Sequence, residues 1–391
     1  MNRTADQTVM KEMNKLAVLN EIRFQSPISR TQISDTIGLT KATVSAMIEE
    51  LIDDGLVIEV GQGQSRVGRR PIMLSFNAKA ATVIGVDLGV EYVRVVATDL
   101  ALHILATYSC ELPQNVGLME IIEIVVGAVH EIDRQVMKKS LKGTIGIGIG
   151  VPGLVDYERG IVLRAPHLHW DNIPIRSILQ SRLNKFICVD NEANAGAMAE
   201  KFYGQGKYAS SLLYVSAGTG IGTGIVMGDE LVRGSDGMAG EFGHMSVDRY
   251  GDVCSCGNIG CWELYASEQA LINTYQKLTG RSETFTEVLH DYRNEDAAAI
   301  QAFDTVGRSL GLGVASLTNG LNPSMVVIGN RLAEAGDRMI DVIQRSILEH
   351  SFISPFSKAT VQLSSFGSNA CAVGSATLVL HEYFAGLVGH V

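Results

Sequence analysis

Residues 240–263 read GEFGHMSVDRYGDVCSCGNIGCWE, and no other stretch constrains the fold of this chain so strongly. One imidazole, His244, is followed by the three thiols of Cys254, Cys256 and Cys261, in the order H-x9-C-x-C-x4-C. Four such ligands complete the tetrahedral coordination of Zn²⁺ and leave no open position. We therefore expect one zinc ion per chain, with a structural role.

The other cysteines and the hydropathy of the chain indicate the compartment in which the protein is found. Three cysteines beside a histidine can also be reduced core thiols, but Gly257 and Gly260 suit tight turns around a metal. The remaining cysteines are expected to be ordinary buried thiols; they are Cys110, Cys188 and Cys371. Clustered thiols are typical of a reducing compartment, and no apolar run approaches the roughly 18 residues of a membrane span. A cytoplasmic location with no membrane contact is expected.

Charge is distributed unevenly along the 391 residues, whose net charge is −10. Residues 1–80 contain ten basic and nine acidic residues, whereas residues 81–391 contain 22 basic and 33 acidic ones. An acidic body disfavours loose binding to nucleic acid. Any DNA contact is therefore expected on one small face of the N-terminal part.

The N-terminal part predicts three short helices in succession. Apolar residues at helical spacing form the first, which ends at Ser26-Pro27. The second opens with the capping-box pattern Ser29-Arg30-Thr31-Gln32 and stops at Gly38, and Thr40 can cap the third. Two helices separated by a Gly-Leu-Thr turn have helix-turn-helix spacing.

Two strand-like runs, 56–60 and 72–76, follow the helices and are joined by a glycine-rich segment with three arginines. Such a hairpin is typical of a wing that lies along the sugar–phosphate backbone or enters the minor groove. A three-helix domain used only for dimerisation is the alternative, and the basic wing favours DNA. We predict a winged helix-turn-helix over residues 1–80. Its expected DNA contacts are Thr31, Gln32, Thr40, Lys41, Ala42, Thr43, Ser45, Arg66, Arg69 and Arg70.

From residue 81 onward, strands alternate with helices and two glycine-rich turns interrupt the pattern. This alternation predicts a two-lobed α/β body with a cleft between the lobes. The first lobe is expected over residues 81–195, completed by a C-terminal helix at about 375–391. The second lobe, residues 196–374, carries the zinc cluster.

The motifs of the body occur in a particular order. They are Asp87-x-Gly89, Val151-Pro152-Gly153, Asn191-Glu192-Ala193-Asn194, Gly218-Thr219-Gly220-Ile221-Gly222, Glu241-x-Gly243-His244 and the cysteine run. This combination resembles the ROK family, which contains sugar kinases and also repressors with an added N-terminal winged helix. The resemblance covers essentially the whole chain and implies an actin-like, ribonuclease H-like body. Within the family, residues 61–71 and 261–268 most resemble bacterial xylose-operon repressors.

The resemblance also implies a function. We expect a sugar-responsive repressor, a homodimer or tetramer, that binds a palindromic operator and is released by a small sugar, most readily D-xylose. The residues that match the family's sugar-contacting positions are Gly153, Asn191, Glu192, Glu241, His244 and Glu263. Some have simpler alternatives, because Asn191 and Glu192 can also cap a helix and favour its dipole.

A sugar kinase with an attached DNA-binding domain is the rival hypothesis. The family's kinases carry Asp-x-Gly-Gly-Thr in the first phosphate loop, where this chain has Val90 and Glu91. A carboxylate about 4 Å from a phosphate charge costs roughly 4 kcal/mol at an effective dielectric constant near 20. Glu192 also replaces the catalytic aspartate of the family. We therefore expect no enzyme, while a repressor answering to another sugar, an amino sugar or a partner protein stays open.

Overall fold

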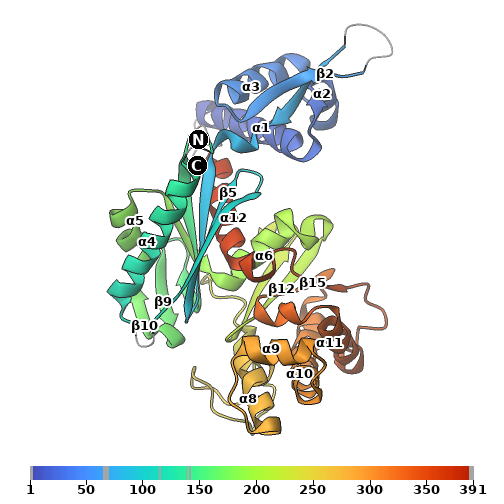
Figure 1. The fold of residues 1–391 in the computed structure, drawn as a ribbon. Helices are drawn as coiled ribbons and strands as arrows, with labels where there is room; N and C mark the ends of the chain where they lie inside the picture. The colour runs from blue at the N-terminus through green and yellow to red at the C-terminus, as the bar shows by residue number, and fades with distance from the viewer. Residues whose placement is uncertain (1–2, 65–69, 114–115, 138, 141, 387–391) are drawn as a thin grey trace.

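A computed structural model describes residues 3–64, 70–113, 116–137, 139–140 and 142–386 of the chain (Figure 1). A small N-terminal domain stands at one end of a two-lobed body. Among the described residues, the helices are all too short or too polar to cross a membrane.

The N-terminal domain has three helices and a three-stranded sheet of order β1-β3-β2. Its elements are α1 (Arg3–Gln25), β1 (Ile28–Ser29), α2 (Arg30–Ile37), α3 (Lys41–Asp53), β2 (Val57–Gln62) and β3 (Ile72–Phe76). The predicted capping box forms, because the Ser29 hydroxyl accepts from the backbone N–H of Gln32 and the Gln32 side chain accepts from that of Ser29. Gly38 ends α2 in the left-handed conformation, at φ 77°. The predicted helix-turn-helix and hairpin are therefore confirmed.

The first lobe is built on a five-stranded sheet of order β11-β7-β4-β5-β6. Its strands are β4 (Thr82–Leu88), β5 (Tyr92–Asp99), β6 (Ile104–Glu111), β7 (Thr144–Val151) and β11 (Ile187–Asn191). Helices α4 (Leu118–Val136) and α5 (Ile175–Leu183) cover one face. A smaller antiparallel sheet joins β8 (Leu154–Asp156), β9 (Ile161–Ala165) and β10 (Trp170–Ile173).

The second lobe has a sheet of order β14-β13-β12-β15-β16. Its strands are β12 (Ser211–Ala217), β13 (Ile221–Met227), β14 (Glu230–Leu231), β15 (Met325–Gly329) and β16 (Thr360–Leu363). A large apolar cluster packs one face against the helices α7 (Glu263–Ala266), α8 (Glu268–Thr279), α9 (Phe285–Arg293), α10 (Ala297–Leu321) and α11 (Asp337–His350). Short 3₁₀ helices complete the chain; they are η1 (Ala78–Ala80), η2 (Pro166–Leu168), η3 (Gln205–Tyr208), η4 (Phe242–His244), η5 (Arg331–Ala335) and η6 (Gly367–Asn369).

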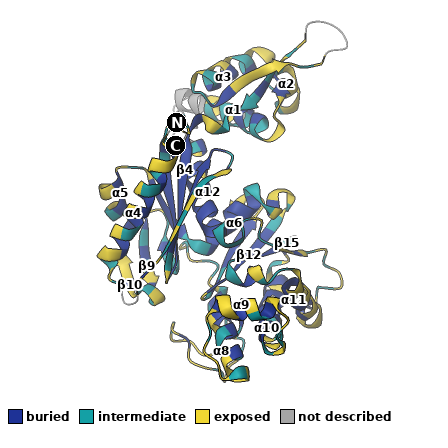
Figure 2. Ribbon diagram, in the orientation of Figure 1, coloured by how far each residue is buried: buried dark blue, intermediate teal, exposed yellow. Residues whose placement is uncertain are grey.

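Two central helices, α6 (Glu192–Tyr203) and α12 (Ala370–Gly386), lie between the two sheets and pack against each other. Helix α12 covers the first sheet closely, because glycines face it: a Cβ on Gly85 would lie 1.8 Å from the carbonyl oxygen of Ala372. Helix α6 covers the second sheet. Both are dark blue over most of their length in Figure 2. The division expected between residues 195 and 196 therefore falls inside α6, a helix that the two lobes share.

Candidate functional site

A cleft between the lobes brings together side chains that are far apart in the sequence. The backbones of β11 and of the turn after β7 form one wall, and the β12–β13 turn and η4 form the other. All six residues of the predicted sugar set line this cleft; they are Gly153, Asn191, Glu192, Glu241, His244 and Glu263. The structure thus places the whole set around one space.

Asn191 uses its side chain to build the first wall. Its Oδ1 accepts from the backbone N–H of Ala193 at 2.8 Å and of Asn194 at 3.3 Å, so it caps α6 as the alternative interpretation anticipated. Its Nδ2 donates to the carbonyl oxygen of Gly153 at 2.9 Å. Gly153 has φ 94°, and a Cβ there would lie 2.3 Å from the carbonyl oxygen of Arg164. Asn191 therefore holds Gly153 at the cleft and begins the helix that carries Glu192.

Glu192, which is partly exposed, stands in the cleft near the buried carboxylate of Asp87. Its Oε1 accepts from the Ser216 hydroxyl at 3.4 Å. Asp87, only 2% exposed, accepts from the Tyr92 hydroxyl at 3.1 Å and lies 3.5 Å from Nη1 of Arg94. Burial, and then the charge of Asp87, raise the pKa of Glu192 to about 7. Near neutral pH, Glu192 can thus act as a hydrogen-bond donor as well as an acceptor.

The second wall depends on two glycines that let the chain fold back on β13. Gly240 has φ 106°, and a Cβ there would lie 2.4 Å from the carbonyl oxygen of Thr223. A Cβ on Gly243 would lie 2.0 Å from the carbonyl oxygen of Ile221. This close approach places Glu241, just before η4, and His244, at its end, on the cleft.

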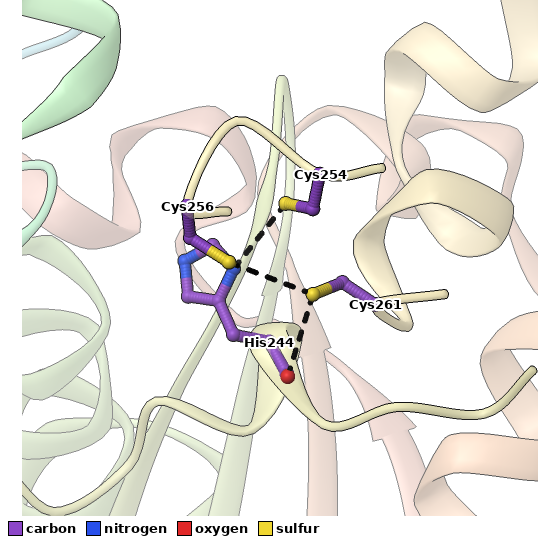
Figure 3. A group of neighbouring side chains, drawn as sticks. All are labelled: His244, Cys254, Cys256 and Cys261. Carbon is purple, nitrogen blue, oxygen red and sulfur yellow. Dashed lines mark hydrogen bonds between the residues drawn. The ribbon is translucent and has the colours of Figure 1, made fainter. Parts of the chain in front are cut away.

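The four predicted metal ligands form a compact cluster next to the cleft (Figure 3). Their ligand atoms all lie within 4.8 Å of one another, with 3.7 Å between Cys254 Sγ and His244 Nδ1 and 3.7 Å between Cys256 Sγ and Cys261 Sγ. A zinc ion with bonds of about 2.3 Å at tetrahedral angles separates its sulfur ligands by about 3.8 Å. The spacing of this donor set therefore fits a tetrahedral metal ion.

Glu263 connects the metal cluster to the cleft. Its Oε1 lies 2.9 Å from Cys254 Sγ and 3.4 Å from His244 Nδ1, and the residue also lines the cleft. The neighbouring Trp262 is fully buried and donates from Nε1 to the carbonyl oxygen of Ser309 at 2.8 Å, which anchors the loop in the core of the second lobe. The cysteine loop, the core and the cleft are thus joined over two consecutive residues.

Most of the predicted DNA-contact residues within the described part of the chain are exposed, and the exposed Gln32 and Thr40 also cap helices. Lys41, Ala42 and Arg70 are exposed, as is Thr31, and Thr43 and Ser45 are half-buried on α3. The side chains of Gln32 and Thr40 are engaged in capping α2 and α3. Arg66 and Arg69 lie outside the described residues.

Several residues that line the cleft were not predicted from the sequence. Tyr92, Thr219, Asn330 and Arg331 line the cleft, and Asn330 donates from Nδ2 to the Ser216 hydroxyl at 3.0 Å. None of these four stands in a ligand-type cluster in the sequence. Thr219 lies in the glycine-rich turn of residues 218–222, and this motif could have indicated it. Tyr92, Asn330 and Arg331 lie in no motif that could have indicated them.

An acidic side chain borders the same region of the cleft. Glu268 is 8% exposed and lies 3.4 Å from Nη1 of Arg331. Burial raises the pKa of Glu268 to about 6, the charge of Arg331 lowers it, and the charges of Glu91 and Glu334 raise it further. Two further carboxylates and one guanidinium therefore act on the charge of Glu268 at this edge.

Comparisons with known proteins agree on both parts of the chain. The model of the ROK family matches residues 83–382, and a winged helix-turn-helix DNA-binding model matches residues 14–58. The xylose repressor of Bacillus subtilis (strain 168) is 38% identical, over 97% of this chain and 98% of its own length.

Two solved structures extend the comparison to the fold. A ROK family transcriptional regulator, described as a homolog of the E. coli MLC protein, is 25% identical with a TM-score of 0.82, over 97% of this chain and 98% of its own. A ROK family glucokinase from Streptomyces griseus, in complex with glucose and AMPPNP, is 29% identical with a TM-score of 0.70. It covers 76% of this chain and 98% of its own. The regulator matches the winged helix and the body together.

Proposed function

The chain belongs to the ROK family, and we propose that it is a transcriptional repressor that leaves its operator when D-xylose occupies the interlobe cleft. One observation carries the proposal: a winged helix and a cleft lined by all six predicted sugar residues occur in the same chain. The similarity to a protein named xylose repressor over nearly the full length supports the choice of sugar.

In this proposal the cleft recognises hydroxyl groups by direction. Glu241 and Glu263 would accept hydrogen bonds, the backbone at Gly153 would approach the sugar ring closely, and Glu192 would donate when protonated and accept when ionised. Epimers differ in hydroxyl direction, so a buried partner left without its hydrogen bond penalises the wrong sugar.

The cysteine cluster would hold one structural Zn²⁺ through His244, Cys254, Cys256 and Cys261. When bound, the ion would supply coordination energy that stabilises the loop. His244 would bind it through Nδ1, the ring nitrogen that lies 3.7 Å from Cys254 Sγ, which leaves Nε2 available to the cleft. Glu241 and Glu263 would then be held in a fixed frame, as outer partners of a metal site commonly are.

The same cleft is poorly suited to ATP. Val90 lines it where a kinase of the family has glycine, and the carboxylates of Glu91, Glu268 and Glu334 act on the neighbouring space. Negative charge here disfavours a polyphosphate, in keeping with a binding protein. The body's similarity to a glucokinase makes the kinase a testable second candidate: sugar-dependent release of ADP from ATP would establish it.

Operator release requires sugar binding and DNA binding to be linked. We propose a homodimer on a palindromic operator, in which closure of the cleft changes the placement of the two winged helices. A sugar acts only through its different affinities for the two states, and a 100-fold loss of operator affinity corresponds to about 2.7 kcal/mol.

Fluorescence anisotropy tests the proposal directly. The full-length protein is titrated onto an operator obtained by in vitro selection, and D-xylose, glucose and N-acetylglucosamine are then added separately. Release by D-xylose alone is the expected result. Release by another sugar would reassign the ligand, and specific DNA binding that all three sugars leave unchanged would contradict sugar control.

A further inference from the structure

An arginine at the end of α1 joins the winged helix to the body. Arg23 donates from Nη2 to the Tyr203 hydroxyl at 2.7 Å, and its guanidinium lies 4.0 Å from the centre of the Phe384 ring. The same guanidinium lies 5.7 Å from the ring of Phe76, the last residue of β3. Phe76 and Phe384 are 6.3 Å apart. One cation of the winged helix is therefore held by the body through a hydrogen bond and through an aromatic face.

The two body residues that hold Arg23 stand at the far ends of the central helices. Tyr203 is the last residue of α6, and the first residue of that helix is Glu192 of the cleft. Phe384 lies in the last turn of α12, which Figure 1 shows running from the middle of the body to the winged helix. At a rise of 1.5 Å per residue, α6 spans about 18 Å and α12 about 25 Å.

The near ends of the two helices meet next to Glu192, which lines the cleft. A Cβ on Gly150 would lie 2.4 Å from Cys371 Sγ, in the first turn of α12, and 3.5 Å from the Cα of Glu192. Further along, a Cβ on Gly374 of α12 would lie 2.0 Å from the carbonyl oxygen of Ala195 in α6. Helices in such close contact have little space to move independently, so a displacement at Glu192 reaches both far ends.

The contact at Arg23 is bordered by free space on the side of α1. A cavity of about 300 Å³ lies between α1 and the body, and its lining includes Leu16, Phe24, Phe202 and His381. Part of the boundary between α1 and the body is therefore not closely packed.

We propose that Arg23 is the positioning residue through which the sugar cleft sets the orientation of the winged helix, by way of α6 and α12. This inference rests on the proposed function and specifies its regulation. Arg23 contacts neither the sugar cleft nor the exposed residues of α3, so its effect is on the linkage between the two sites.

The test separates linkage from binding. Tyr203→Phe removes the hydroxyl to which Arg23 donates and keeps the ring, and Arg23→Ala removes both contacts. For each full-length variant, calorimetry measures the Kd of D-xylose, and anisotropy measures the operator Kd with and without saturating D-xylose. The ratio of the two operator Kd values is the coupling factor. Tyr208→Phe is the matched control, because Tyr208 is 91% exposed.

The expected result is a coupling factor reduced about tenfold in Arg23→Ala, equivalent to about 1.4 kcal/mol, with the D-xylose Kd unchanged. Tyr203→Phe should show a smaller reduction and Tyr208→Phe none. A wild-type coupling factor in folded Arg23→Ala, or in Tyr203→Phe if the alanine variant does not fold, would overturn the inference alone. A wild-type protein that no sugar releases from DNA would contradict the proposed function and the inference with it.

Discussion

The winged helix and the cleft arrange their proposed functional residues in opposite ways. In the winged helix, Lys41, Ala42, Thr43 and Ser45 follow one another in the first turns of a single helix, and Thr40 caps that helix locally. In the cleft, the proposed sugar residues come from both lobes and from separate segments between residues 153 and 263. The part of the proposed DNA-binding face on α3 therefore depends on local structure, whereas the cleft depends on how distant segments are held together. Each of the following experiments separates these two dependences.

Cys256→Ser should have the largest effect. Loss of one thiolate removes a quarter of the proposed coordination sphere, and structural zinc sites contribute roughly 10 kcal/mol or more to the folding of the segments that they organise. We expect the zinc content to fall from one ion per chain to nearly none, with a clearly lower thermal midpoint of the body. Mass spectrometry of the metal and calorimetric melting measure the two effects.

Cys110→Ser is the matched control for the metal site, because Cys110 is a half-buried thiol in β6 and belongs to the first lobe. It should keep the full zinc content. One zinc ion per chain in Cys256→Ser would show that the proposed cage is wrong.

Glu241→Ala should separate the two regions functionally. Removing a hydrogen-bonding carboxylate from the cleft costs about 1.5–3 kcal/mol of sugar binding, or roughly 10- to 100-fold in Kd. The winged helix is unaffected, so the variant should bind the operator normally and remain bound when D-xylose is added. Calorimetry and anisotropy measure these properties. Normal induction would exclude Glu241 from the sugar site, and Glu349→Ala, an exposed carboxylate of α11, should behave as wild type.

Glu192→Gln should reduce the pH dependence of stability. Burial and the charge of Asp87 raise the pKa of Glu192 from 4.5 to about 7. Between these values the folded state keeps the proton that the unfolded state loses, so the free energy of unfolding falls as the pH rises from 4.5 to about 7. For a partly exposed carboxyl we expect at most about 2 kcal/mol.

Urea unfolding at about pH 5 and about pH 8 measures this contribution. The wild-type protein should lose more stability than Glu192→Gln between the two conditions. An equal loss in both proteins would mean that Glu192 titrates in its ordinary range.

Arg70→Ala should have the smallest effect and should be confined to DNA. Removing one phosphate contact weakens binding to all sequences alike and lowers the slope of log K against log salt by about 1. Arg69→Ala is expected to act in the same way. Anisotropy over a series of salt concentrations measures the slope, and sugar affinity should stay unchanged. An unaltered slope in both variants would remove the wing from the DNA interface, while Arg134→Ala, an exposed arginine of α4, serves as the control.

Local signals were enough to predict much of this molecule. The capping residues Ser29 and Thr40 begin α2 and α3 at the expected positions, and strand β3 has the expected bounds. The spacing of His244 and the cysteines predicted the compact cluster. These features were predictable because hydrogen bonds within a turn and ligands within one loop involve residues that are neighbours in the chain.

Other features depend on contacts that no local pattern contains. Arg233 lies 2.6 Å from Asp190 and 3.7 Å from the centre of the Tyr157 ring, which joins the lobes, yet it stands in no motif. Likewise, the contact of Arg23 with Tyr203 connects residues 180 positions apart. The residue types and their local turns were thus present in the chain itself. Only the tertiary structure brings these residues together in space. The sheet order and the packing of α6 on α12 place the ends of elements that are distant in sequence next to one another.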